Sequence, residues 1–71
     1  MAKFKCYKES DGGRITVIDT VRTLEKAIDI CVGEISNDWP KEVEEARQAL
    51  SLRRYYGCGY SSVQYNIEEI D

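Results

Sequence analysis

Two short segments near the start of the chain alternate between apolar and polar residues, as strands with one buried face do. In KFKCYK, residues 3–8, Phe4 and Cys6 share one side of an extended chain. RITVIDTV, residues 14–21, is rich in β-branched residues, which favour strands. The intervening SDGG supplies residues that adopt the positive φ angles of a tight turn. The pattern therefore predicts a β-hairpin.

The hairpin turn admits two registers, with a two-residue loop at Asp11 and Gly12 or at Gly12 and Gly13. Both registers predict the same buried face, because a shift that keeps the alternation intact leaves the apolar set together. That face carries Phe4, Cys6, Ile15, Val17 and Val21. The opposite face carries Lys3, Lys5, Tyr7 and Ile18, and the apolar Ile18 there is a hint that something covers the outer side of the sheet.

From residue 23 the spacing of apolar residues becomes helical. Thr23 is a typical N-cap, and Glu25 lies in the first turn, where the helix dipole favours an anion. Pro40 ends this helix and fits the first turn of a second one, with Asp38 or Trp39 at the cap. The predicted apolar stripe of the first helix is Leu24, Ala27, Ile28, Cys31 and Ile35.

The second predicted helix places Trp39, Val43, Ala46 and Leu50 on one face, with Ala49 beside them. Its last turn carries the two arginines of RRYYGCGY, where cations meet the negative end of the helix dipole. Gly57 lies where a left-handed C-terminal cap is expected.

After Gly59 the alternation of a strand returns, with Val63, Tyr65 and Ile67 on the buried face. The order is therefore strand, strand, helix, helix, strand. We predict one small two-layer α+β domain over residues 1–71, with two helices on one face of a three-stranded sheet, antiparallel or mixed, and the last strand beside the first. A chain of 71 residues forms a single hydrophobic core.

Charge is unevenly distributed along the chain, which has a net charge of −3. Residues 1–22 carry five basic and three acidic side chains, whereas residues 23–50 carry three basic and seven acidic ones. Proteins that bind nucleic acid usually carry a basic footprint, so this balance argues against that function class. We also expect an intracellular, cytoplasmic protein, because the start lacks the apolar segment of a signal peptide and no apolar run approaches the roughly 18 residues that span a membrane.

Motifs for catalysis, metals and cofactors are absent from the sequence. The chain has no histidine, which removes the commonest general base and metal ligand, and its three cysteines form no CxxC pair. The segments DGGR and GCG lack the spacing of a phosphate-binding loop. We therefore expect no enzyme activity, no metal site and no cofactor.

Cysteine use fits a reducing compartment, because three widely spaced cysteines are a poor basis for a disulfide framework. Cys6 and Cys31 lie on predicted apolar faces and are expected in the core. Cys58 lies between two glycines near the arginine pair, so the sequence allows it to be exposed and reactive.

Tyrosine is concentrated in one segment, with four of the five tyrosines between residues 55 and 65. Tyrosine and arginine are enriched at protein interfaces, and Tyr65 alone of these four is expected to point inward. The alternative for Tyr55 and Tyr56 is that they only cover the bottom of the core. The predicted partner-binding residues are Arg53, Arg54, Tyr55, Tyr56, Tyr60 and Tyr7.

Two function classes follow from this cluster. The first is a non-enzymatic protein-binding module, a small inhibitor or adaptor that occupies a surface of a larger protein or complex. The alternative is a single-stranded nucleic-acid binder that stacks bases on the tyrosines of residues 53–60 and uses the arginines for phosphates.

In size, acidity and hairpin-helix arrangement, the whole chain resembles the compact proteins that phages and mobile elements encode to block host machinery, including anti-CRISPR proteins. The resemblance implies an inhibitor that binds a protein. No motif carries it, so it assigns no functional residue.

Overall fold

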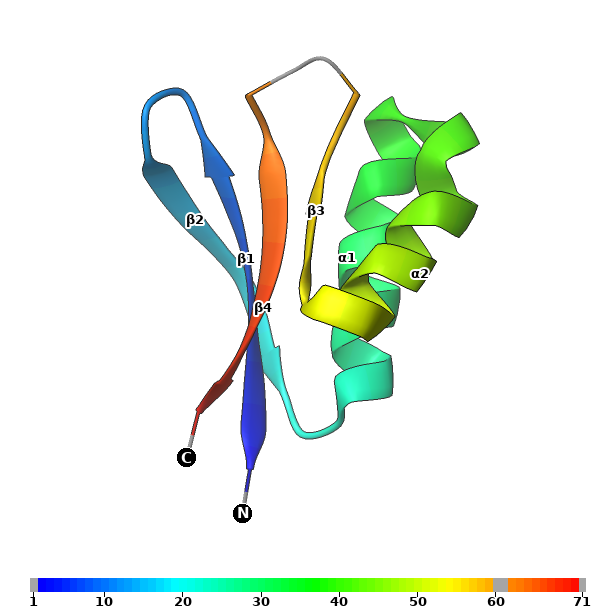
Figure 1. Ribbon diagram of the computed structural model, residues 1–71. Helices are drawn as coiled ribbons and strands as arrows, with labels where there is room; N and C mark the ends of the chain where they lie inside the picture. Colours follow the sequence, from blue (N-terminus) through cyan, green and yellow to red (C-terminus); the bar gives the residue numbers. More distant parts are fainter. Residues whose placement is uncertain (1, 60–61, 71) are drawn as a thin grey trace.

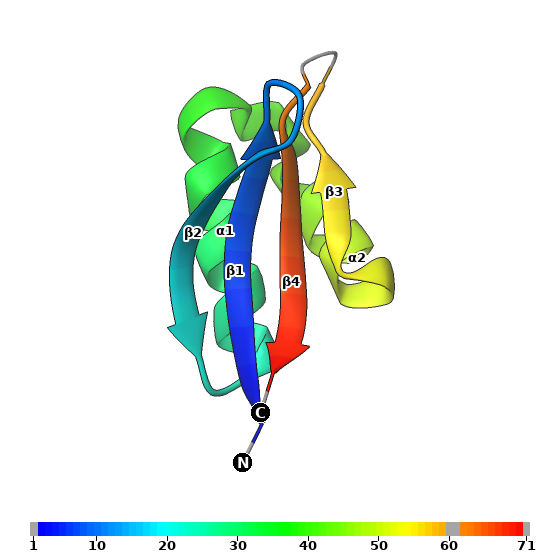
Figure 2. The ribbon, with the colours of Figure 1, turned by 90° about the vertical axis from the view of Figure 1, so that its left-hand side faces the viewer.

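Two helices cover one face of a four-stranded antiparallel sheet in the computed structural model, which describes residues 2–59 and 62–70 (Figure 1). The strand order is β2-β1-β4-β3, so β2 and β3 form the two edges. Figure 2 views the sheet with the helices behind it. In chain order the elements are β1 (Lys3–Ser10), β2 (Arg14–Val21), α1 (Leu24–Asp38), the 3-10 helix η1 (Pro40–Glu42), α2 (Val43–Arg53), β3 (Tyr55–Gly57) and β4 (Gln64–Ile70).

The predicted hairpin is confirmed, but with a three-residue loop in place of either two-residue loop. Ser10 pairs with Arg14, which leaves residues 11–13 in the turn. All three have positive φ angles, of 45°, 77° and 105°. Two glycines adopt that conformation without the steric cost of a Cβ, and an aspartate tolerates it better than most residues.

A bulge in β2 overturns the predicted faces of that strand. Tyr7 pairs with Val17 but Cys6 pairs with Asp19, so Ile18 is the additional residue. The insertion of one residue reverses the alternation along the strand. Ile15 and Val17, predicted in the core, are 59% and 55% exposed, whereas Ile18, predicted outside, packs against the core.

Helix α1 begins and ends where the sequence predicts. Thr23 has extended backbone angles, and its Oγ1 accepts a hydrogen bond of 3.2 Å from the backbone N–H of Lys26, as an N-cap does. The helix ends at Asp38, directly before Trp39 and Pro40. Pro40 then opens the short η1 turn that precedes α2. The predicted stripe of α1 is buried at Ala27, Ile28, Cys31 and Ile35, while Leu24 is half-buried.

The end of α2 differs from the prediction, and the difference adds the fourth strand. Arg54, not Gly57, adopts the left-handed conformation of a C-cap, at φ 69°, and its N–H donates to the Leu50 carbonyl over 3.2 Å. The chain therefore leaves the helix three residues early. Tyr55–Gly57 then pairs with β4, so the prediction of a three-stranded sheet is wrong.

Strand β4 lies beside β1, as predicted for the last strand, with Cys6 opposite Ile67. The inner face of the sheet and the apolar faces of both helices form one core. Its fully buried side chains include Ile35, Leu50 and the three cysteines. The opposite face of the sheet has no helix over it in the described part of the chain (Figure 2).

Candidate functional site

A row of side chains crosses the outer face of the sheet at one level. Val17 on β2 pairs with Tyr7 on β1, Tyr7 pairs with Asn66 on β4, and Asn66 pairs with Tyr55 on β3. Residues directly opposite one another project on the same side of a sheet. We call Tyr7, Arg53, Tyr55 and Asn66 the tyrosine face. Its two rings lie two strands apart, which corresponds to about 10 Å.

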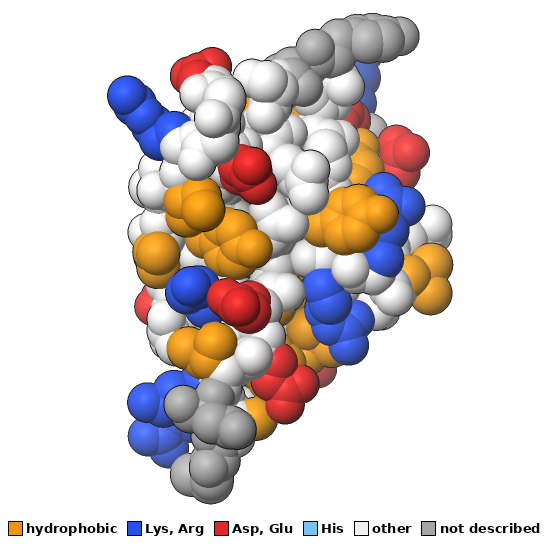
Figure 3. All heavy atoms as spheres, turned by 60° about the vertical axis from the view of Figure 1, so that its left-hand side comes forward, with side chains coloured by type: hydrophobic (Ala, Val, Ile, Leu, Met, Phe, Trp, Pro, Cys, Tyr) orange, Lys and Arg blue, Asp and Glu red, His pale blue; other side chains and the backbone are white. Residues whose placement is uncertain are grey.

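Each ring of the tyrosine face has a cation beside it. The Arg53 guanidinium lies 4.8 Å from the Tyr55 ring centroid, and its Nε donates to the Tyr55 carbonyl over 3.3 Å. The Lys5 ammonium lies 5.4 Å from the Tyr7 ring centroid and 3.3 Å from a Glu68 carboxylate oxygen. These contacts hold Arg53 and Tyr55 together at the edge of the sheet. Figure 3 shows hydrophobic side chains among charged ones on this side of the molecule.

Asn66 occupies the centre of the tyrosine face. Its Oδ1 accepts a hydrogen bond of 3.1 Å from the Gln64 side chain. Its Nδ2 is buried and has no hydrogen-bond partner among the described residues. An unpaired buried donor costs about 1 to 3 kcal/mol, so this position is not optimised for stability.

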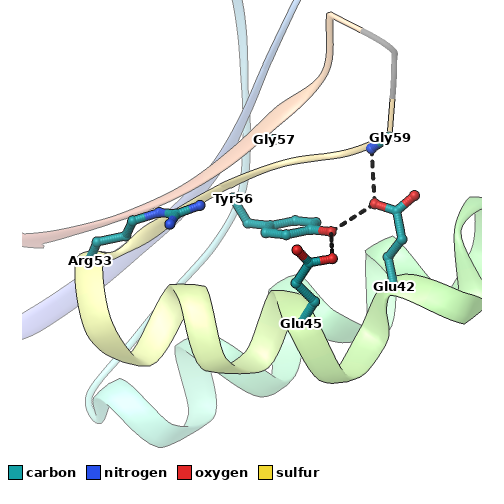
Figure 4. A pocket seen from close by; sticks show the side chains of 6 residues that line it. All are labelled: Glu42, Glu45, Arg53, Tyr56, Gly57 and Gly59. Carbon is teal, nitrogen blue, oxygen red and sulfur yellow. Dashed lines mark hydrogen bonds between the residues drawn. The ribbon is translucent and has the colours of Figure 1, made fainter.

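Tyr56 projects to the other side of β3 and is only 5% exposed. Its hydroxyl donates to Glu42 Oε1 over 2.8 Å and lies 3.2 Å from Glu45 Oε2 (Figure 4). A hydroxyl has one hydrogen, so it donates to one of these carboxylates at a time. The ring and its bonds join β3 to the start of α2, which makes Tyr56 part of the core and unavailable as a contact for a partner.

The same carboxylate holds the chain after β3. The backbone N–H of Gly59 donates to Glu42 Oε1 over 2.9 Å. Gly59 has a φ of +51°, and a Cβ there would lie 3.2 Å from both Glu42 Oε2 and Trp39 Nε1. Positive φ and close approach together explain the glycine.

A shallow pocket of about 450 Å³ lies at this junction, lined by Glu42, Glu45, Arg53, Tyr56, Gly57 and Gly59 (Figure 4). Burial, followed by the hydrogen bond and the charge of Glu42, raises the pKa of the Tyr56 hydroxyl. Tyr56 therefore keeps its proton and is engaged as a donor. The carboxylates of the pocket have a structural role, in fixing β3 and the chain after it to the helices.

The sequence allows an exposed, reactive thiol at Cys58, and the structure does not have one there. Its side chain is fully buried. Burial, and then the charges of Glu42 and Asp38, raise its pKa to about 11. A thiol with a raised pKa is a poor nucleophile at neutral pH, so Cys58 is a core residue, as Cys6 and Cys31 are.

The remaining predicted site residues lie apart from the tyrosine face or outside the described part of the chain. The Arg54 guanidinium points back toward α2, where it donates to the carbonyls of Leu50 and Ser51. Tyr60 lies outside the described residues. Of the six predicted partner-binding residues, the structure therefore brings Tyr7, Arg53 and Tyr55 to one face.

Sequence reasoning missed Ile15 and Val17 as outer-face residues. Ile15 and Val17 are exposed because of the bulge. The signal for the bulge in the sequence is the adjacent apolar pair Val17-Ile18 in a strand that otherwise alternates. The alternation of the last strand predicts that Asn66 lies on the outer face. Its position between Tyr7 and Tyr55 follows only once Tyr55–Gly57 is recognised as a strand.

Within residues 2–59 and 62–70, no group of three or more acidic or cysteine side chains is arranged to hold a metal ion. None of the described helices has the length and apolar character to cross a membrane. Comparisons with protein-family models, curated proteins and solved structures found no match. The interpretation of the site therefore depends on its own geometry.

Proposed function

We propose that the protein is a non-enzymatic protein-binding module, an inhibitor or adaptor that binds a larger protein through the tyrosine face. The observation that carries the proposal is the exposed Tyr55, 45% accessible, with Arg53 over its ring and Tyr7 on the same side of the sheet. Large rings with polar tips next to arginine dominate the energy of protein interfaces. Because the chain resembles phage-encoded inhibitors, we propose an inhibitor as well as an adaptor.

The arrangement of Arg53 supports an interface that is formed before the partner arrives. Its side chain already contacts both the ring and the carbonyl of Tyr55, so less rotamer freedom is lost on binding. Asn66 supplies a polar centre between the two rings. The three cysteine side chains are all buried, and this use as core residues fits the reducing cytoplasm that the sequence predicts.

Affinity capture from nuclease-treated lysate of the native host tests the proposal. We compare wild type with Tyr7→Ala/Tyr55→Ala and with Leu52→Ala as a control. Leu52 is 86% exposed on α2, and the tyrosine variant removes one exposed and one half-buried ring, so neither variant truncates a buried core residue. One protein retained by wild type and Leu52→Ala and lost by the tyrosine variant supports the proposal; equal retention by all three contradicts it.

Single-stranded nucleic-acid binding is the second candidate, and one observation favours it. Tyr7 and Tyr55 lie on one sheet face with Lys5 and Arg53 beside them, an arrangement that stacks bases in several single-strand binders. Against it, Lys5 is already paired with Glu68, which leaves less positive charge for phosphates. Nucleic-acid affinity that falls steeply with salt and is lost in Tyr7→Ala/Tyr55→Ala would favour this candidate.

A further inference from the structure

The two edge strands of the sheet differ in how much of their backbone is available to pair with another strand. Strand β3 is three residues long, and the Arg53 side chain donates to its Tyr55 carbonyl. Strand β2 is eight residues long and, among the described strands, is bordered by β1 alone. Figure 2 shows β2 along the free side of the sheet. A long edge strand presents unpaired backbone N–H and C=O groups, which are a template for another strand.

The second half of β2 is protected against such pairing. The Asp19 carboxylate accepts a hydrogen bond of 2.7 Å from the backbone N–H of Thr20, so this donor is already satisfied. The bulge at Ile18 breaks the regular ladder just before it. Bulges and inserted charges are the devices by which proteins blunt strand edges. Between Arg14 and the bulge, residues 15–17 have neither device.

The open half of β2 is also its most apolar exposed part. Ile15 and Val17 are β-branched, flank Thr16, and rank among the exposed large hydrophobic residues of the described chain. Both project to the outer face, opposite Glu9 and Tyr7. Exposed apolar side chains beside an unpaired edge favour strand addition.

We propose that this edge binds a second copy of the chain, with the two β2 strands antiparallel and a twofold axis at Thr16. Ile15 of each copy then lies opposite Val17 of the other, and Thr16 lies opposite Thr16. This register keeps all four apolar side chains on the outer face, because residues directly opposite one another project on the same side. It also pairs backbone groups that face solvent in the monomer.

Charge favours a second copy in this orientation. Arg14 lies at the start of β2 and Asp19 near its end. An antiparallel twofold pairing brings Arg14 of each copy next to Asp19 of the other, whereas a parallel pairing sets like charges side by side. Such an isologous contact is the commonest route to a symmetric dimer. The dimer joins the two sheets and leaves both tyrosine faces on the same side.

Sedimentation of the purified protein from micromolar to millimolar concentration is the first test, and it needs no partner. The expected result is a concentration-dependent rise from 8.2 kDa to twice that mass. Val17→Lys places a charge in the apolar contact of each copy and is expected to leave only monomer. Leu52→Lys, at an exposed apolar residue of α2, is the matched control and should dimerise as wild type does. A monomer throughout, or a dimer unaffected by Val17→Lys, overturns the proposal.

Disulfide trapping tests the register. Thr16 and Thr20 are both exposed threonines of β2, but only Thr16 lies on the proposed axis. Opposed residues of antiparallel strands have Cα atoms about 4.5 to 5.5 Å apart, which lies within the range that a disulfide spans. Under mild oxidation, Thr16→Cys should form covalent dimer and Thr20→Cys should not, while the three buried native thiols leave wild type monomeric on a denaturing gel. Equal trapping of both variants, or none of Thr16→Cys, contradicts the twofold pairing.

Discussion

The two faces of the sheet carry similar residues in different surroundings. On the inner face, Tyr56 and Tyr65 are buried under the helices, and the Tyr56 hydroxyl is bonded to carboxylates of the helical layer. On the outer face, Tyr55 is exposed and Tyr7 half-buried, with cations beside both rings. The difference shows that an abundance of tyrosine does not identify an interface. The side of the strand on which a ring lies decides whether the ring is buried in the core or accessible to a partner.

The largest expected effect lies in the covered layer. Leu50 is fully buried on α2, so Leu50→Ala should lower the free energy of unfolding by about 2 to 4 kcal/mol, a large share of what a domain of this size has. Leu52→Ala, two residues further along the same helix, removes an 86% exposed side chain and should change stability by less than about 0.5 kcal/mol. Urea unfolding measures both; equal losses would mean that α2 packs through a different face.

Adjacent tyrosines of β3 give the next largest contrast. Tyr56→Phe removes the donor that Glu42 and Glu45 share, and should cost about 1 to 2 kcal/mol of stability. Tyr55→Phe removes a hydroxyl from an exposed ring and should cost about 0.5 kcal/mol or less. Chemical denaturation of the two variants checks this order, and a larger loss for Tyr55→Phe would reverse the assignment of the two faces.

Alkaline pH should weaken the covered layer. Burial raises the pKa of Cys58 from 9.0 to about 11 and that of Tyr65 from 10.0 to about 12. The unfolded chain then releases these protons at lower pH than the folded chain does. The stability is fully present below pH 9 and falls as the pH rises through 9 to 12.

Thermal unfolding across this pH range measures the effect. Cys58→Ala removes one of the titrating groups, so its stability should fall less between pH 9 and pH 11 than that of wild type. A fall of the same size in both proteins would show that Cys58 does not contribute to it.

A smaller effect than in the covered layer, and a gain in stability, is expected at the centre of the outer face. Asn66→Val removes a buried unpaired amide and introduces a residue that favours strands, so it should raise stability by about 1 kcal/mol. If the polar centre serves binding, the same change should weaken capture of the partner. A variant that is less stable than wild type would mean that the Gln64 contact outweighs the unpaired donor.

Local signals predicted the helical layer well. The N-cap at Thr23 and the break at Pro40 both lie where their side-chain chemistry requires, and neither depends on distant residues. The pairing of the last strand with the first also follows from the order of elements.

The fourth strand, the exposed residues of β2 and the tyrosine face depend on tertiary contacts. Gly57 is typical of a helix cap, but pairing with β4 draws Tyr55–Gly57 into the sheet and moves the left-handed residue to Arg54. The bulge at Ile18 then decides which residues of β2 are exposed. Tyr7 and Tyr55 share a face only because β3 pairs with β4, so the tyrosine face could not be predicted from its residues alone.

Site-specific photo-crosslinking in the native host tests most directly whether the outer face contacts a protein. A photoreactive phenylalanine analogue replaces Tyr7, Tyr55 or, as the control, the exposed Leu52 of α2. The account predicts one and the same protein crosslinked from positions 7 and 55 and none from position 52. Crosslinks from position 52 alone, or nucleic acid in place of protein at positions 7 and 55, would contradict it.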